Sequence, residues 1–395
     1  MKSLIAKPLL AAVLLTAAHA AAAQSYQQTN LVTDNQAVTP ALLTDPNLVN
    51  PWGIALSPSA GAFWVSDNGT GVSSLYNGDV NGSAFKVASL VVTIPGVPSE
   101  TTGSPTDQIF NGGGGFDVPV GTGTKSSLFV TTSEDGTLSG WNPGVSLTQA
   151  QLAVTTPGAV YKGLAIAGSN LYAANFAQNT IDVFDSSFAP AALAGKFVDP
   201  NAAAGYAPFN IQNLGGALFV TYAKQDAAKF NEIDSVGLGF VDEYNLDGTF
   251  NKRIGTDSAL AAGGVDALNA PWGLALAPSN FGKYSSDLLV GGFGSGEITA
   301  FDPVTGTFEG AISGADGNPL INDGLWGLDF GNGVTAGDTN KLYFAAGVNG
   351  EKDDLFGSIG AASPVPEAST TLSFGLLLTL GGLALVARRK KTAVE

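Results

Sequence analysis

The sequence contains no cysteine, and its one histidine and one methionine, His19 and Met1, lie near the start of the chain. Disulfide bonds therefore cannot stabilise the fold. The region after residue 23 has neither a thiol nor an imidazole, which excludes Cys nucleophiles and Ser-His-Asp catalysis. Zinc, copper and haem sites with Cys or His ligands are excluded for the same reason, whereas oxygen-ligand sites for calcium or magnesium remain.

Charged residues are scarce, at 13% of the chain, and several of the basic ones lie at its two ends. Residues 24–363 contain 11 basic and 31 acidic residues, which gives a formal net charge of −20. Because nucleic-acid binding depends on Lys and Arg contacts to phosphates, this charge argues against a nucleic-acid partner. It also argues against binding to anionic membrane surfaces, and it favours solubility and the attraction of cations.

Residues 1–23 have the three parts of a secretory signal peptide. Lys2 and Lys7 lie before or beside a short apolar run at 8–18, and small residues follow at 20–23. The run is shorter than the roughly 20 residues that a membrane-spanning helix needs, which favours a signal peptide over an anchor. A buried helix is the alternative.

A different pattern occupies residues 363–395. A short motif at 365–369 is followed by an apolar stretch at 371–387 and a basic cluster at 388–391. The apolar stretch is just long enough to span a membrane once, and the basic cluster is expected to stay on the cytoplasmic side. A plain single-span anchor is the alternative. The motif and cluster residues that define the pattern are Val365, Pro366, Glu367, Arg388 and Arg389.

This order of motif, transmembrane helix and basic cluster resembles the PEP-CTERM sorting signal. The resemblance implies that an exosortase-type protease removes the tail after the helix has stayed transiently in the inner membrane. It also implies export to the cell surface or exterior of a Gram-negative host that makes exopolysaccharide or biofilm.

Between these two ends, residues 24–362 lack long amphipathic helical patterns. Short apolar runs bounded by Gly, Asn, Asp and Pro recur instead, and these are typical of strands and tight turns. A segment with the pattern Gly-apolar-Ala-apolar, or a weaker version of it, recurs along the chain and precedes a second apolar run each time. The six segments are 51–56, 115–120, 161–166, 208–213, 271–276 and 325–330.

Six such units predict an all-β, six-bladed β-propeller. One unit cannot bury both faces of its own sheet, whereas radial stacking of the units can. A β-helix would show shorter repeats, and a β-sandwich would not repeat the Pro-Trp-Gly strand. We expect the segment 26–32 to supply the outermost strand of the last blade and so to close the ring.

The six-unit pattern resembles the class of six-bladed propellers that includes NHL-repeat proteins and gluconolactonase-like enzymes. More narrowly, segments 220–226, 239–242 and 355–359 resemble an uncharacterised family of exported bacterial propeller proteins. That family carries no established activity. The gluconolactonase-like proteins use an oxygen-ligand metal, which implies that calcium is the ion to consider at the channel.

The first strand of each unit is expected to line the central channel, and its start is expected to meet the end of the second run at one mouth. Asn and Asp are also favoured in turns, and Trp in a first strand also suits packing, so a structural role is the alternative. Segment 220–226 is the strongest candidate because a long insertion follows it. The candidate ligand-binding residues are Trp52, Asp117, Lys162, Asn175, Asn210, Tyr222, Lys224, Asp226, Trp272 and Trp326, and the candidates for calcium are Asp117, Asn175 and Asp226.

Two functions fit these observations. The first is a non-catalytic extracellular binding protein that holds exopolysaccharide or a matrix protein, with exposed aromatic side chains stacked on sugars. The second is a calcium-dependent, lactonase-like hydrolase with its site at the central channel. The absence of imidazole and thiol groups favours the first. The sequence requires no cofactor, and calcium is the ion that its oxygen groups would suit.

Overall fold

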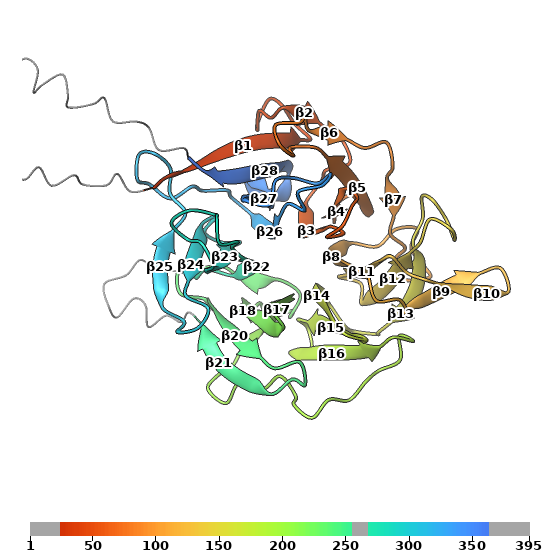
Figure 1. Cartoon of the computed structure of the whole chain (residues 1–395). Helices are drawn as coiled ribbons and strands as arrows, with labels where there is room; N and C mark the ends of the chain where they lie inside the picture. The colour runs from red at the N-terminus through yellow and green to blue at the C-terminus, as the bar shows by residue number, and fades with distance from the viewer. Residues whose placement is uncertain (1–23, 255–267, 363–395) are drawn as a thin grey trace, which may run out of the picture. The chain divides into compact units, whose positions relative to one another are not determined.

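Six small sheets, mainly antiparallel, are arranged radially around one axis in the region Ser25–Ala362 (Figure 1). The computed structural model describes residues 24–254 and 268–362. The sheets form the all-β six-bladed propeller that the sequence repeats predicted. We number the blades along the chain, starting from the sheet that contains residues 51–93.

The first three blades follow one another in sequence. Blade 1 contains β3 (Pro51–Ala55), β4 (Phe63–Asp67), β5 (Val72–Asn77), β6 (Lys86–Val87) and β7 (Val92–Thr93). Blade 2 contains β8 (Pro105–Phe110), β11 (Phe129–Ser133), β12 (Thr137–Trp141) and β13 (Gln151–Thr155), and carries the hairpin of β9 (Asp117–Val120) and β10 (Gly123–Ser126). Blade 3 contains β14 (Tyr161–Ala167), β15 (Asn170–Asn175) and β16 (Thr180–Asp185).

The last three blades complete the ring. Blade 4 contains β17 (Tyr206–Leu214), β18 (Ala217–Gln225), β19 (Glu232–Ile233), β20 (Gly239–Tyr244) and β21 (Phe250–Ile254). Blade 5 contains β22 (Pro271–Leu276), β23 (Leu288–Gly292), β24 (Ile298–Phe301) and β25 (Phe308–Ala311). Blade 6 contains β26 (Leu325–Phe330), β27 (Lys341–Gly347), β28 (Asp353–Ala361), β1 (Tyr26–Thr33) and β2 (Leu43–Thr44), and a short turn, α2 (Val348–Glu351), joins β27 to β28.

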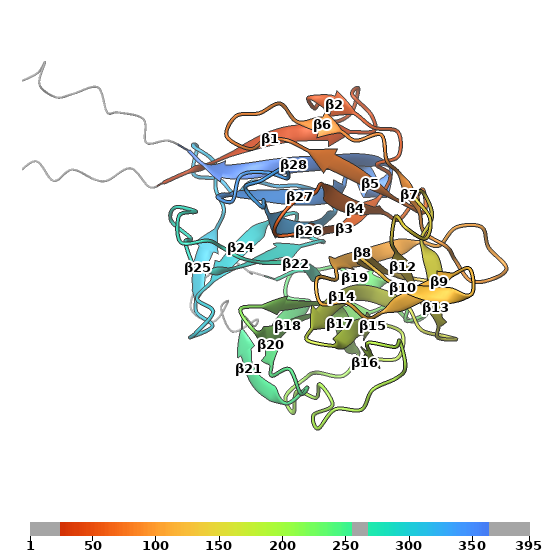
Figure 2. The same ribbon diagram turned by 45° about the vertical axis from the view of Figure 1, so that its right-hand side comes forward.

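The first strand of each sheet lies innermost. Strands β3, β8, β14, β17, β22 and β26 contact one another in that order, and β26 returns to β3. The ring closes in blade 6, where the N-terminal strand β1 pairs antiparallel with the C-terminal strand β28, from Tyr26 opposite Ala361 to Thr33 opposite Leu355 (Figure 2). This confirms that segment 26–32 closes the ring, although the two-residue strand β2, and not β1, is the outermost strand of blade 6.

The hydrophobic core is divided among the contacts between neighbouring blades. Six clusters of buried side chains each join two adjacent blades, and a seventh lies where the inner strands meet. Between blades 6 and 1, for example, Phe63 and Tyr76 pack on Phe356 with ring centroids 5.5 Å and 5.3 Å apart. Alternate residues of one strand thus stabilise two different blade contacts, as expected for the two faces of a buried sheet.

The prediction that segment 115–120 is the inner strand of blade 2 is wrong. That segment contains β9, which pairs only with β10 in a hairpin that projects from the ring (Figure 1). The inner strand is β8, which has polar residues such as Thr106, Asp107 and Gln108 where the other blades are mostly apolar. The apolar pattern that suggested an inner strand arises because Val118 packs beneath the hairpin, between blades 2 and 3.

The predicted signal peptide at 1–23 and the predicted sorting tail at 363–395 lie outside the described residues. Across residues 24–254 and 268–362, no helix has the length and apolar character needed to cross a membrane.

Candidate functional site

Each inner strand begins with a local irregularity in its pairing. The register shifts near the start of β3, β8, β14, β17, β22 and β26. Such bulges re-aim the side chain at the irregular position. The residues at these shifts are Trp52, Thr106, Lys162, Phe209, Trp272 and Trp326.

Aromatic side chains from these positions fill the channel at the starts of the strands. The rings of Trp52 and Trp326 stack with centroids 3.6 Å apart, and Trp272 lies edge-on to them at 6.1 Å and 5.7 Å. All three are buried, with 3% or less of each side chain exposed. The prediction that these tryptophans are exposed for sugar stacking is therefore wrong, because they pack on one another as an aromatic plug.

An ion pair caps the aromatic plug. Lys162 Nζ lies 2.5 Å from Glu134 Oε1 and 4.9 Å from the centre of the Trp52 ring, and only 1% of Lys162 is exposed. Two further acids, Glu232 and Glu351, interact with the Lys162 charge. Burial raises the pKa of each of these carboxyl groups, and the positive charge of Lys162 partly opposes this rise. The predicted candidate Lys162 therefore has a partner, and that partner, Glu134, is a residue that sequence reasoning missed.

Directly after the irregular positions, the inner strands approach too closely for side chains. A Cβ atom added at Gly53 would overlap Asp107, and one added at Gly163 would overlap Asn210. The corresponding atom at Gly273 would lie 2.5 Å from the Trp326 carbonyl oxygen. Glycine is required here because no larger residue fits. These contacts form a narrow waist that separates the aromatic plug from the other end of the channel.

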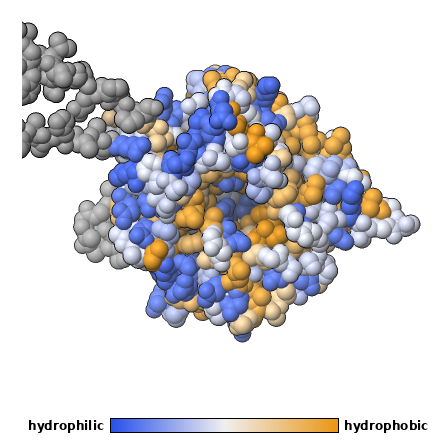
Figure 3. All heavy atoms as spheres, viewed as in Figure 1, coloured by the Kyte–Doolittle hydropathy of each residue, from blue (hydrophilic) through white to orange (hydrophobic). Residues whose placement is uncertain are grey.

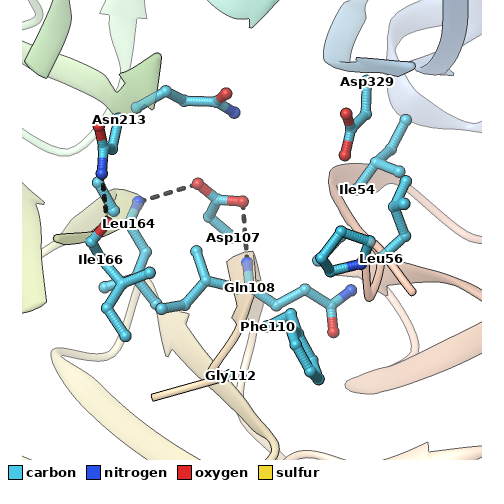
Figure 4. A pocket seen from close by; sticks show the side chains of 15 residues that line it. Ile54, Leu56, Asp107, Gln108, Phe110, Gly112, Leu164, Ile166, Asn213 and Asp329 are labelled. Atoms are coloured by element: carbon cyan, nitrogen blue, oxygen red, sulfur yellow. Dashed lines mark hydrogen bonds between the residues drawn. The ribbon is translucent and has the colours of Figure 1, made fainter. Parts of the chain in front are cut away.

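A cavity of about 410 Å³ lies at that other end, where the inner strands finish (Figure 4). Figure 3 shows a hollow at the centre of the ring, on the face turned to the viewer. The walls combine aliphatic and aromatic side chains with carboxyl and amide groups from blades 1, 2, 3, 4 and 6. The principal lining residues are Ile54, Leu56, Asp107, Gln108, Phe110, Leu164, Ile166, Gln212, Asn213 and Asp329.

Two carboxyl groups, Asp107 from β8 and Asp329 from β26, point into this cavity (Figure 4). Asp107 is held by two backbone N–H groups: Leu164 N donates to Oδ2 at 2.9 Å, and Gln108 N donates to Oδ1 at 2.8 Å. Asp329 Oδ1 accepts a bond of 2.8 Å from Phe330 N. The cavity therefore has two fixed acidic groups from different blades.

Burial changes the protonation of both acids. It raises the pKa of Asp107 from 3.8 to about 8, with a smaller contribution from the negative charge of Asp329. It also raises the pKa of Asp329 to about 7. A protonated carboxyl group both donates and accepts hydrogen bonds, whereas a carboxylate only accepts. Near neutral pH the pair can therefore donate hydrogen bonds to a ligand, or exchange a proton with it.

Several predicted candidates have structural partners instead. Asn210 Nδ2 donates to the Trp272 carbonyl at 2.8 Å, which fixes the waist. Asn175 accepts from Val160 N and donates to Asp182 at 2.8 Å. The Tyr222 hydroxyl is hydrogen-bonded to that of Tyr244 at 2.8 Å in the buried contact between blades 3 and 4.

The segment favoured by sequence analysis stabilises its own loop. Asp226 Oδ1 accepts a bond of 3.0 Å from Phe230 N, as expected for an aspartate that caps a turn. Lys224 Nζ lies 5.7 Å from the Tyr206 ring. The exposed Asp117 accepts a hydrogen bond from Thr124 in the β9–β10 hairpin.

The predicted calcium set of Asp117, Asn175 and Asp226 does not come together. These residues belong to three different blades, and each uses an oxygen in a local hydrogen bond. Within the described part of the chain, no three Asp, Glu or His side chains are grouped so that they could hold a metal ion. This correction removes the geometric basis of the lactonase-like alternative.

The acids that line the cavity were missed for an identifiable reason. Asp107 lies in the polar strand β8, which lacks the repeat pattern, and Asp329 lies at the far end of its strand. Glu134 could have been found, since it follows the second run of blade 2 just as Asn68 does in blade 1. Asn68 Nδ2 donates to Glu134 Oε2 at 3.0 Å.

No family model matches the sequence. The chain is 36% identical over 325 residues to Uncharacterized protein R648 of Acanthamoeba polyphaga mimivirus. The alignment covers 80% of this chain and 76% of that protein. The chain belongs to this family. A second mimivirus relative, Uncharacterized protein L690, is 34% identical over 324 residues and is covered to 81%. The names of these relatives assign no activity to the family.

Two solved structures show distant likeness. Virginiamycin B lyase from Staphylococcus aureus is 13% identical, with a TM-score of 0.44 over 85% of this chain and 99% of that one. A chain of a nidogen/laminin complex is 11% identical, with a TM-score of 0.42 over 75% of this chain and 84% of that one. Likenesses of this size carry no functional argument, so the blade count rests on the strand pairing described above.

Proposed function

We propose that the protein is a non-catalytic binding protein whose ligand is a neutral, hydroxyl-rich molecule, such as a saccharide unit of an extracellular polymer. The observation that carries the proposal is the cavity at the strand ends, with Asp107 and Asp329 fixed inside it. Its volume of about 410 Å³ is within the usual range for small-ligand sites.

The chemistry of the walls supports a neutral ligand. Asp107 and Asp329 line the same cavity as the amide residues Gln108, Gln212 and Asn213, so hydroxyl groups would find both donors and acceptors. The aliphatic side chains of the walls would cover the apolar face of a sugar ring. An anionic ligand is disfavoured, because residues 24–363 carry a formal net charge of −20 and none of the described residues that line the cavity is Lys or Arg.

We also propose that the propeller is exported and that an exosortase-type protease removes residues 363–395, which places its ligand in the extracellular matrix. The support is the sequence pattern of the two ends. Cell fractionation combined with mass spectrometry of the termini tests this part. An intact chain in the cytosol would contradict it.

Calorimetric titration with a panel of neutral oligosaccharides tests the binding proposal. We expect Asp107→Asn and Asp329→Asn each to weaken binding about tenfold, which is about 1.4 kcal/mol. Asp117→Asn is the matched control, since Asp117 is exposed on the hairpin outside the cavity, and it should leave the affinity unchanged. A ligand whose affinity is the same in all three variants would contradict the cavity as its site.

Glycoside hydrolysis is a second candidate, because the raised pKa values of Asp107 and Asp329 suit proton transfer near neutral pH. Incubation of the bound oligosaccharide with the protein separates the two functions. A binding protein leaves the saccharide intact, whereas a hydrolase releases new reducing ends at a rate that Asp107→Asn and Asp329→Asn abolish.

A further inference from the structure

A pair of buried aspartates lies in the contact between blades 6 and 1, where the ring closes. Asp67 ends β4 and Asp354 is near the start of β28, and both side chains are fully buried. The Asp354 carboxyl group is placed beside β3, because its Oδ1 accepts a bond of 2.9 Å from Asn50 N. The next residue, Pro51, is the pairing partner of Asp67. The two aspartates therefore both lie next to the short stretch of Asn50 and Pro51.

Each of these aspartates has one oxygen without a partner. Asp67 Oδ2 accepts a bond of 3.0 Å from Ser74 N, while Asp67 Oδ1 and Asp354 Oδ2 are buried and have no hydrogen-bond donor. A buried carboxylate oxygen without a donor or a cation is costly, so such atoms call for an explanation. Neither oxygen belongs to the central cavity or to the aromatic plug.

The surroundings of the pair are acidic. The negative charge of Asp45 acts on Asp67, and those of Asp34, Asp353 and Glu351 act on Asp354. All ion pairs among the described residues use Lys162, Lys252, Arg253 or Lys341, and none of them involves Asp67 or Asp354. None of the described residues thus forms an ion pair with either carboxyl group.

The contact between blades 3 and 4 shows the opposite arrangement. There the buried Asp242 receives a bond of 2.8 Å from Arg253 Nε, and the same guanidinium group also pairs with Asp199. Two acids buried between those blades are therefore neutralised by a side chain of the protein itself. The contact between blades 6 and 1 has two comparable buried acids, but no basic side chain in the described part of the chain pairs with them.

We propose that a hard cation, with calcium as the best match, binds between Asp67 and Asp354 in the contact that closes the ring. Two carboxylate oxygens supply negative charge, and backbone carbonyl groups and water would complete the oxygen shell that calcium prefers. An ion bound there would link β4 of blade 1 to β28 of blade 6. This site is independent of the proposed saccharide cavity.

Calorimetric melting of the purified full chain, in EDTA and in millimolar calcium chloride, tests the proposal. We expect calcium to raise the melting temperature of the wild-type protein by several degrees, since a ligand that binds only the folded state stabilises it. Asp67→Asn and Asp354→Asn should each remove most of this rise. Asp117→Asn, a change at an exposed aspartate of the hairpin, should retain it.

Three results would overturn the proposal: no shift with calcium, a calcium shift in Asp67→Asn and Asp354→Asn that is as large as in the wild-type protein, or a wild-type melting temperature that responds to pH alone. The last result would show that the two carboxyl groups share a proton instead. If a variant fails to fold, terbium luminescence of the wild-type protein gives an independent measurement. Excitation through tyrosine should give a signal that calcium displaces, because Tyr76 is bonded to Ser74 beside Asp67. Absence of a displaceable signal would count against the site.

Discussion

The two ends of the central channel are built from the same six strands but have opposite properties. At the strand starts, stacked tryptophans and the Lys162–Glu134 ion pair fill the space, whereas at the strand ends a cavity of about 410 Å³ remains. The residues that repeat from blade to blade, Trp and Gly, form the filled end and the waist. The acids that depart from the repeat, Asp107 and Asp329, face the cavity. Repetition in this ring therefore marks packing, and deviation from it marks the candidate site.

Loss of the Lys162 charge at the filled end of the channel should have the largest effect on stability. We expect Lys162→Met to lower the free energy of unfolding by about 3 kcal/mol, because it leaves the half-buried Glu134 without its cation above the aromatic plug. Lys224→Met is the matched control, since Lys224 forms no ion pair among the described residues and its Nζ lies 5.7 Å from the Tyr206 ring, and it should cost less than about 1 kcal/mol. Urea denaturation measures both. Equal effects of the two substitutions would show that the ion pair does not hold the filled end together.

The waist should resist even one added methyl group. In Gly273→Ala the new Cβ atom would lie 2.5 Å from the Trp326 carbonyl oxygen and close to Leu328, so inner strands of blades 5 and 6 must move apart. We expect a loss of about 2 kcal/mol in the free energy of unfolding. Gly113→Ala has open space around it, with its nearest atom at 3.9 Å, and serves as the control. A neutral Gly273→Ala protein would mean that the strands are not in tight contact at this level.

Asp107, at the cavity end of the channel, should make the stability of the protein depend on pH. The pKa of Asp107 is about 8 in the folded protein and near 3.8 in the unfolded chain, so the folded state binds more protons between these values. Stability should therefore decrease as pH rises through this window and level off above about pH 8, by about 1.4 kcal/mol per pH unit for this one group. Denaturation at pH 6 and pH 7 should give a smaller difference in Asp107→Asn than in the wild-type protein. The Asp117→Asn control should keep the wild-type difference.

The ring itself was predictable, because each blade repeats the same alternation of apolar runs and turns. Segment 26–32 was placed correctly as the closing strand for the same reason. The location of Trp52, Trp272 and Trp326 near one mouth also followed from the repeat. Their burial did not, because it depends on a shift of register at each strand start that no local pattern reveals.

The candidate cavity was harder to predict, because its acids are brought together only by the closed ring. Asp107 and Asp329 are far apart in sequence: Asp107 lies outside the repeat segments, and Asp329 replaces the alanine of the repeat in segment 325–330. Asp117 was named and Asp107 was overlooked, because the hairpin of Asp117 carries an apolar alternation that a sequence cannot distinguish from that of an inner strand. Strand β8 was overlooked because its residues are polar. Their burial depends on hydrogen bonds such as those that Leu164 N and Gln108 N donate to Asp107.

The pairing of β1 with β28 gives the ring a seam at which both chain ends leave from one place. Tyr26 lies directly opposite Ala361. A circular permutant could join residues 25 and 362 through a short linker and open the chain in the exposed β9–β10 turn instead. In that protein β28 and β1 would form an ordinary hairpin. Blade 6 would then be one continuous stretch of chain. Blade 2 would become the last blade to be completed, because its strands β11, β12 and β13 would lie at the new N-terminal end and β8 at the new C-terminal end.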